Sequence, residues 1–517
     1  MFSHTPLVRR RVLIAVMAAS ATLAACSSTN AKKSGDLALD GTPTPSTSGA
    51  ASPLPGQSAS PGATAISSAS AAAGTTGGTT GGSTGGSTGG STGGTTGRVP
   101  GVTGGTGNHT WSGPVGPGVT ATTIKIGIST FKIGDFAKNL GVNVDVGDNE
   151  AQAYAVIKYI NAHGGIAGRK VTPSFFQVDF STQGGTDGQF EAAACEQWTQ
   201  DDKVFAAVNL SLQRQQLLPC LAKKDVLAVH NGLQIDEARM SPYRRWYYAT
   251  MAGSGTIQDR AAHTEDKMLC SRGWFKNATV GIIYYDEPAM RWIVDHIYEP
   301  EIKACGGKKV VKQAAGRGLT TADQTFVARF QQEGVTNVMF LGEGGTYPYT
   351  FMPAAQNQLY FPKYSLRSDH APAIQLAAAQ VPPEQLKNAI GIGWSPMQDT
   401  DAGGDPGPTG AGDRLCLSIF KNASISMADR GARLAAMNFC SGLFFLQQAL
   451  NNTSSVTSTG VSQAVAKLGT SFSAPETFAS RFTASQHDCP STYRVFAYNF
   501  QLKKFRYITG NKAMETG

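Results

Sequence analysis

Strand-like apolar runs and helix-forming segments alternate along residues 123–342, and this alternation restricts the possible folds more than any other feature of the chain. Gly164 and Gly165 end the first helix, as glycine does at helix C-termini. Because parallel strands need long crossovers, the order predicts a parallel sheet with helices on both faces. The predicted strands are 123–128, 171–180 and 204–208, and the predicted helices are 151–162 and 188–198.

The same order recurs further along the chain. Segments 160–165 and 302–307, each ending in Gly-Gly, occupy equivalent places in the two halves. We therefore expect an α/β protein of two doubly wound lobes, with a ligand held between loops at the carboxyl ends of the strands. The second set consists of strands 278–285, 310–314 and 338–342 and helices 290–304 and 322–333.

The amino-terminal region precedes these lobes and has a different composition. Residues 41–97 contain no charged residue and pass into Gly-Gly-Ser-Thr repeats, so we expect residues 26–118 to form a disordered linker. Before it, Arg9 to Arg11 and an apolar run end in Leu-Ala-Ala-Cys26. This ending resembles the lipobox of bacterial lipoproteins, which implies a signal peptide at 1–25 and lipidation of Cys26. The alternative is an ordinary signal peptide that contains a cysteine.

A lipid on Cys26 would place the protein on the outer face of the cytoplasmic membrane, where cysteines oxidise. The seven other cysteines are too widely spaced for a zinc motif, and we expect no metal or cofactor. The net charge of +8, without an arginine-aromatic module, gives no sign of nucleic-acid binding. We expect the disulfides Cys195–Cys220 and Cys270–Cys305, and favour Cys416–Cys440 among the remaining three, which include Cys489.

Residues 159–171, with the sequence Tyr-Ile-Asn-Ala-His-Gly-Gly-Ile-Ala-Gly-Arg-Lys-Val, are distinctive. They resemble the opening of the branched-chain amino-acid type of periplasmic binding protein, the solute receptor of ABC importers. The resemblance implies a type I fold in which the chain crosses three times between lobes, a small-molecule ligand, an ABC permease as partner and a monomer. It places lobe 1 at 119–249 plus 393–470, and lobe 2 at 250–392 plus 471–517.

Polar and aromatic residues follow the predicted strands and are candidate ligand contacts. By the resemblance, the segment after the third strand matches a carboxylate-binding loop, and Asp369 matches the acid that binds a ligand ammonium group. Each candidate could instead cap a helix or pack at the hinge. The candidates are Asn209, Ser211, Gln213, His230 and Asn231 in the first lobe, and Tyr285, Asp286, Gly345, Tyr347, Ser368 and Asp369 in the second.

These features predict a solute-binding lipoprotein that delivers a small polar solute, such as an amino acid, to an ABC permease. One alternative is a sensing receptor that uses the same lobes without transport. The other is a cell-envelope enzyme, for which Glu343 and Asp369 form the one acid/base pair that can be assembled. The sequence has no phosphate-binding loop and no H-E-x-x-H motif, and we expect no enzyme activity.

Overall fold

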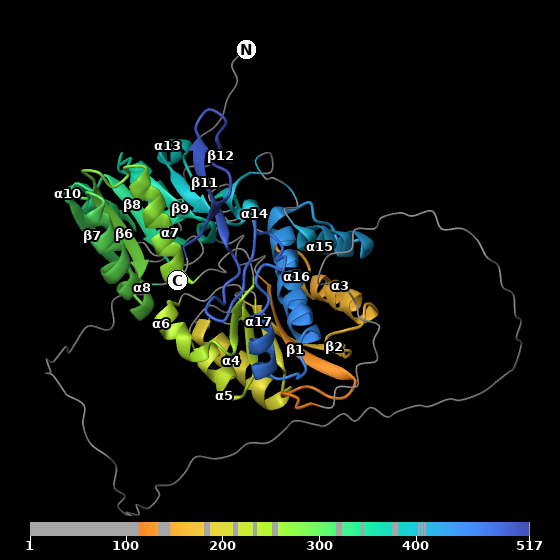
Figure 1. Ribbon diagram of the computed structural model, residues 1–517. Coiled ribbons are helices and arrows are strands. Elements are labelled where there is room, and N and C mark those ends of the chain that lie inside the picture. Colours follow the sequence, from red (N-terminus) through yellow and green to blue (C-terminus); the bar gives the residue numbers. More distant parts are fainter. Residues whose placement is uncertain are drawn as a thin grey trace, which may run out of the picture. The chain divides into compact units, whose positions relative to one another are not determined.

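Figure 1 shows the computed structural model of the chain. Cys26, the predicted signal peptide and nearly all of the predicted linker lie outside the residues that the structure describes. The described residues are 113–132, 145–179, 187–209, 216–230, 235–250, 257–316, 323–342, 346–374, 381–401, 404, 407 and 410–515.

The first sheet has five parallel strands in the order β2-β1-β3-β4-β5. This sheet confirms the predicted parallel α/β arrangement, and strand β1 lies between β2 and β3 as a central strand. The strands are β1 (Thr123–Lys132), β2 (Lys170–Asp179), β3 (Ala206–Asn209), β4 (Leu227–His230) and β5 (Tyr247–Ala249).

Side chains of β1 alternate between two covered faces of this sheet. Ile124, Ile126 and Ile128 are fully buried in one hydrophobic cluster. On the other face Gly127 lies under Trp198, and a Cβ added to this glycine would be 2.8 Å from the indole Nε1. A larger residue at position 127 would therefore push the helix that carries Trp198 away from the sheet.

Helices cover both faces of the first sheet. Helix α3 (Asn149–Ala162) begins at Asp148, whose side chain accepts a hydrogen bond from the Ala151 amide, and it ends before Gly164 and Gly165, both of which have positive φ. Helix α16 contacts α3 and β3. The other helices of this lobe are α4 (Asp187–Glu196), η1 (Gln197–Asp201), α5 (Leu217–Lys223), α6 (Glu237–Met240), η2 (Ser241–Tyr243), α15 (Ala411–Asn422), α16 (Arg430–Asn451) and α17 (Ser458–Val465).

The second sheet has the order β12-β11-β10-β9-β8-β6-β7, with β13 paired to β11. Strands β6 to β10 are parallel, whereas β11 to β13 join antiparallel to their neighbours. The antiparallel strands were not predicted. The strands are β6 (Thr279–Tyr285), β7 (Lys309–Ala315), β8 (Asn337–Leu341), β9 (Lys363–Arg367), β10 (Ile390–Gly393), β11 (Thr492–Asn499), β12 (Lys504–Tyr507) and β13 (Lys512–Ala513).

The helices of the second lobe are generally short. In the part of the chain that the structure describes, no helix is long and apolar enough to cross a membrane. The helices of the second lobe are α7 (Gln258–Ser271), α8 (Pro288–Ile293), η3 (Val294–Tyr298), α9 (Glu299–Ala304), α10 (Asp323–Gln332), α11 (Thr346–Asn357), η4 (Ser368–His370), α13 (Pro383–Leu386) and α14 (Pro396–Asp399).

Two hydrophobic clusters, one on each face of the first sheet, form the first core, and a third cluster forms the second core. The chain passes between the two cores three times. The first crossing lies between Ile257 and Ala261, the second between Trp394 and Cys416, and the third between Cys489 and Tyr493. Trp394 is fully buried in the second core. Phe472, Phe482 and Cys489 follow the predicted boundary at residue 470, and they pack in the first core.

Among the described residues, three disulfides are formed, and each joins parts of one lobe. Cys195–Cys220 links α4 to α5, Cys270–Cys305 links α7 to the end of α9, and Cys416–Cys440 links α15 to α16. These are the pairs expected from the sequence. The remaining described cysteine, Cys489, is buried and free.

Candidate functional site

The carboxyl ends of parallel strands meet at one edge of a sheet, and this edge carries the predicted ligand contacts. In the first sheet Asn209 ends β3 and His230 ends β4, and the two residues are register partners. Their backbones therefore lie side by side, as a shared binding edge requires. The candidates Ser211, Gln213 and Asn231 lie outside the described residues.

In the second sheet, the structure brings the predicted residues Tyr285 and Tyr347 together. Their rings meet edge to face, with centroids 5.2 Å apart, and both residues are buried. The Tyr347 hydroxyl also donates to the carbonyl of Gly316, which follows β7. The two tyrosine rings therefore pack against each other at the ends of β6 and β7. The candidate Gly345 lies outside the described residues.

Asp286 follows Tyr285 directly but faces solvent. Its carboxylate accepts a hydrogen bond from the Arg291 Nε at 2.6 Å, and this bond holds the pKa of Asp286 below its ordinary value. The side chain is 48% exposed. Its partner is therefore the side chain of a neighbouring helix residue, and Asp286 does not cap α8, whose N-cap residue is Glu287.

Ser368 lies at the end of β9 and is fully buried. Its hydroxyl donates to Asp399 Oδ1 at 2.6 Å and accepts from the Trp394 amide at 2.7 Å. The Ser368 hydroxyl is therefore used both as donor and as acceptor, and these two bonds join the end of β9 to the second crossing. Asp399 also accepts from the Tyr507 hydroxyl at 2.7 Å, and burial raises the pKa of this acid to about 8.

Asp369 is buried beside a cation of its own chain. Arg367 donates from Nε to Asp369 Oδ1 at 3.0 Å and from Nη2 to Oδ2, and Gln258 donates to Oδ2 at 3.4 Å. Arg367 is fully buried and Asp369 is 2% exposed. A ligand ammonium group would therefore have to compete with a guanidinium that already holds both carboxylate oxygens.

Two further acids on α7 lie near this ion pair. Glu265 accepts hydrogen bonds from Ser365 and Tyr298, whereas neither carboxyl oxygen of Asp266 has a partner in the part of the chain that the structure describes. Both acids are fully buried, and burial raises both pKa values. Burial thus opposes ionisation of both acids, whereas Asp369 is the acid that forms the ion pair with Arg367.

His370 supplies a hydrogen-bond donor at the same sheet edge. The Arg367 amide donates to His370 Nδ1 at 3.0 Å, so the ring proton of the neutral imidazole is on Nε2. Burial lowers the pKa of His370 to about 4, which keeps the ring neutral. Nε2 has no partner among the described residues.

Tyr349, in α11, provides a second such donor. It is 7% exposed, and its hydroxyl has no partner within the described ranges. Burial and the nearby charge of Asp369 raise its pKa, so the hydroxyl keeps its proton. Buried donors are nearly always bonded, and donors without a protein partner at such an edge indicate a place for a solute or water.

Arg367, His370 and Tyr349 were not predicted as site residues. An arginine at the end of the predicted strand at 364–368 was the available signal, because a guanidinium that becomes buried requires a partner. Residue spacing alone gave no signal for the free donors on His370 and Tyr349, since their state depends on neighbours from other elements.

A separate cavity of about 720 Å³ lies at the opposite edge of the first sheet. Its lining includes Asp225 and Trp246, which precede β4 and β5, and residues 457–460 at the start of α17. It therefore does not belong to the carboxyl-end site. Within the described residues, no group of three or more His, Cys, Asp or Glu side chains could hold a metal ion.

Two doubly wound sheets, three crossings and polar side chains at the carboxyl edges define a type I periplasmic binding fold. A sequence model of the family described as periplasmic binding protein matches residues 123–499. The chain belongs to this family of solute-binding proteins, which are not enzymes. A comparison with curated proteins found no match.

Solved structures share the fold at low sequence identity. A fatty acid ABC transporter substrate-binding protein from Thermomonospora curvata has a TM-score of 0.55 at 14% identity, covering 78% of this chain and 95% of its own. A branched-chain amino acid ABC transporter protein from Thermus thermophilus with bound valine has a TM-score of 0.54 at 13% identity, and the match covers 76% of this chain and 97% of its own. A solute-binding protein from Rhodopseudomonas palustris BisB5 in complex with 3,4-dihydroxybenzoic acid has a TM-score of 0.54 at 11% identity, and the match covers 76% of this chain and 98% of its own.

Proposed function

We propose that this protein is an extracytoplasmic solute-binding lipoprotein that captures a small polar solute between two lobes and delivers it to an ABC permease. The lobes are those assigned from the sequence, except that residues 472–489 pack with lobe 1, and lipidated Cys26 holds the protein at the membrane. The protein acts as a monomer, with the permease as its partner.

The observation that carries this proposal is the pair of unmatched donors at the carboxyl edge of the second sheet. His370 Nε2 and the Tyr349 hydroxyl are buried and have no partner among the described residues. Leaving such donors unpaired costs about 1–3 kcal/mol each, and a solute oxygen that accepts from them would remove that cost. The packed rings of Tyr285 and Tyr347 would contact the apolar part of the solute.

A thermal-shift screen tests this proposal. The panel contains L-leucine, 4-methylpentanoate (leucine without its ammonium group), 4-hydroxybenzoate, 3,4-dihydroxybenzoate and octanoate. A solute present at 100 times its dissociation constant should stabilise the folded protein by about 2.7 kcal/mol. If leucine binds and 4-methylpentanoate does not, Asp369 or another acid meets an ammonium group, as the family resemblance implies.

A matched pair of variants tests whether the ligand-induced shift in melting temperature depends on the proposed binding site. Tyr349→Phe removes a hydroxyl that no described residue uses, so it should keep the melting temperature of the free protein and reduce the ligand-induced shift. Tyr360→Phe removes a hydroxyl that donates to the Val335 carbonyl at 2.8 Å, so it should lower the free melting temperature and keep the shift. Equal ligand shifts in wild type and Tyr349→Phe would contradict the proposed site.

A further inference from the structure

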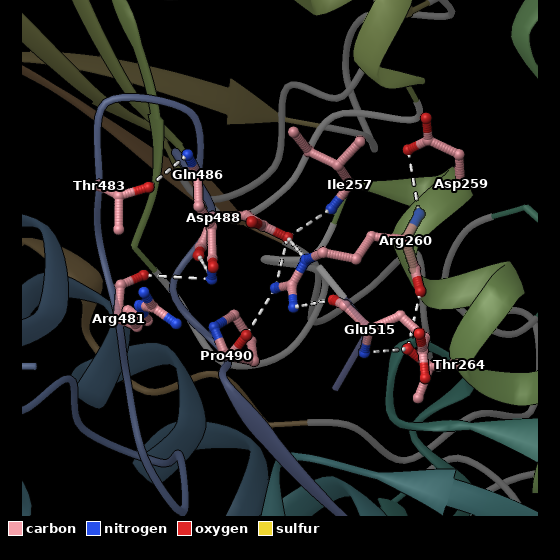
Figure 2. A network of polar contacts seen from close by, with 10 residues as sticks. All are labelled: Ile257, Asp259, Arg260, Thr264, Arg481, Thr483, Gln486, Asp488, Pro490 and Glu515. Atoms are coloured by element: carbon pink, nitrogen blue, oxygen red, sulfur yellow. Dashed lines mark hydrogen bonds and ion pairs between the residues drawn. The ribbon is translucent and has the colours of Figure 1, made fainter. Parts of the chain in front are cut away.

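Arg260 lies in the first turn of α7, where the chain enters the second lobe, and it is only 4% exposed. Its guanidinium donates to three residues in two other segments of the chain (Figure 2). Nε and Nη2 donate to Asp488 Oδ2 at 2.9 and 2.7 Å, Nη2 donates to the Pro490 carbonyl at 2.5 Å, and Nη1 donates to the Glu515 carbonyl at 3.3 Å. One side chain therefore connects the first crossing, the third crossing and a segment that follows β13.

Residues 487–489 hold both ends of the segment that leads from β5 to the first crossing. Next to Asp488, the His487 carbonyl accepts from the Ala249 amide at 2.8 Å, and the Cys489 amide donates to the Ala249 carbonyl at 2.9 Å. The Ile257 amide donates to Asp488 Oδ2 at 3.0 Å (Figure 2). The third crossing thus binds the residue that ends β5 and the residue that precedes α7.

The segment after β13 is attached to the same helix. The Glu515 amide donates to Thr264 Oγ1 at 3.1 Å, and Lys267 pairs with the Glu515 carboxylate. Thr264 and Lys267 are on α7, at one and two turns beyond Arg260. Arg260 is on the same helix, lies in the first crossing and also binds the third crossing.

A small cavity of about 80 Å³ borders the ion pair. Arg481, Thr483 and Gln486 of the loop before Asp488 line it, together with Glu237 and Asp259. Unfilled space beside a buried contact allows the flanking segments to change their relative position without a steric clash. The geometry of these crossings therefore depends on the polar contacts of Arg260.

We infer that Arg260 is a positioning residue of the hinge: by fixing the first crossing to the third, it sets the separation of the two lobes and hence the affinity for solute, without contacting solute. The effect on affinity rests on the proposed function, whereas the effect on lobe separation does not. A planar guanidinium suits this role because it can donate to several acceptors at once in fixed directions, which an ammonium group cannot do.

The test measures the distance between lobes without any solute. Spin labels are attached at Lys158→Cys in α3 and Gln332→Cys in α10, both exposed positions, in a Cys26→Ser background, and distances are measured by pulsed electron paramagnetic resonance. The labelled protein carries Arg260→Met, Asp488→Asn or Arg260→Lys. We expect the first two to broaden and shift the distance distribution, and Arg260→Lys to give a smaller change.

Ile282→Val is the matched control, because Ile282 is fully buried in the second core and distant in sequence from every crossing. It should lower the melting temperature and leave the distance distribution unchanged. Folded Arg260→Met and Asp488→Asn proteins with the wild-type distribution would overturn the inference. If Arg260→Met does not fold, Arg260→Lys and Asp488→Asn decide the question by the same criterion.

A second measurement concerns affinity. For whichever of L-leucine, 4-hydroxybenzoate or octanoate binds the wild type, Arg260→Lys should change the dissociation constant at least about 5-fold, as typical coupling between distant sites does. A change in the distance distribution with an unchanged dissociation constant would restrict Arg260 to lobe geometry and contradict its effect on affinity. If no solute binds the wild type, the proposed function fails, and the distance measurement still decides the role of Arg260 in the hinge.

Discussion

Arg367 and Asp369 are two residues apart at the end of β9 and form a fully buried ion pair, with Arg367 Nε 3.0 Å from Asp369 Oδ1. The same guanidinium donates from Nη2 to Gln258 Oε1 at 2.7 Å, so a hydrogen bond joins α7 to the end of the strand. The residue that the family resemblance assigns to a ligand ammonium group therefore already neutralises a protein cation. Its role in binding stays a prediction, and its role in stability can be tested separately.

Asp369→Asn should lower the free energy of unfolding by about 3–5 kcal/mol, because it leaves the buried charge of Arg367 unpaired. Chemical denaturation measures this change. The double variant Arg367→Met/Asp369→Leu removes both charges and should lose less. Asp286→Asn is the exposed control, since its pair with Arg291 is open to solvent, and it should change stability little. A loss in Asp369→Asn no larger than in Asp286→Asn would contradict the prediction.

Asp399 should make stability depend on pH. Burial raises its pKa in the folded protein to about 8, from an ordinary value of 3.8. The folded state thus holds a proton that the unfolded state has lost, and this contribution to stability falls as pH rises from about 4 to 8. The slope is at most about 1.4 kcal/mol per pH unit.

Denaturation of wild type and Asp399→Asn at several pH values measures this contribution. The variant cannot titrate at this position, so the difference between the two proteins should follow the predicted slope and level off above about pH 8. Glu265 and Asp266 are present in both proteins, so their contributions to the pH dependence cancel in the difference. Parallel stability curves across this range would show that Asp399 titrates normally.

Removing the disulfide between Cys195 and Cys220 should destabilise the first lobe. The two residues are separated by 25 positions, and a loop of this length predicts a loss of about 3–4 kcal/mol in the chain-entropy model. Thermal unfolding of Cys195→Ala/Cys220→Ala measures it, with non-reducing peptide mapping of the wild type as the control. An unchanged melting temperature would be evidence against a stabilising bridge.

Cys26→Ser should release the protein from the membrane fraction and leave its melting temperature unchanged. Cys26 lies outside the described residues, and the predicted linker separates it from the folded lobes. Fractionation and thermal unfolding of the two proteins give both results. Retention of the variant in washed membranes would mean that another attachment holds it.

Six of the parallel strands in the two sheets could be predicted because their signals are local. The isoleucines of β1 alternate, Gly164 and Gly165 stop α3, and each predicted strand in residues 123–342 corresponds to an observed one. The antiparallel strand β11 could not be assigned to the second sheet, because its partner β10 lies about a hundred residues earlier in the chain.

The candidate site was predicted less completely for the same reason. Ser368 and Asp369 were found from their place at a strand end, but the sequence did not reveal that their partners are Asp399 and Arg367. Gln258, which completes the pair, comes from a helix 111 positions away. Whether a polar residue is free to meet a solute depends on such distant neighbours.

The late position of β11 affects how the protein is made. The first core needs Phe482, and the second sheet needs β11 beside β10, so neither lobe is complete until about residue 499 has left the ribosome or the export channel. Contacts between residues so distant in sequence form slowly, and a chain cut short before this point keeps apolar surface exposed. Truncated products should therefore be recognised by envelope proteases, and only chains that extend past β11 should persist as folded receptors.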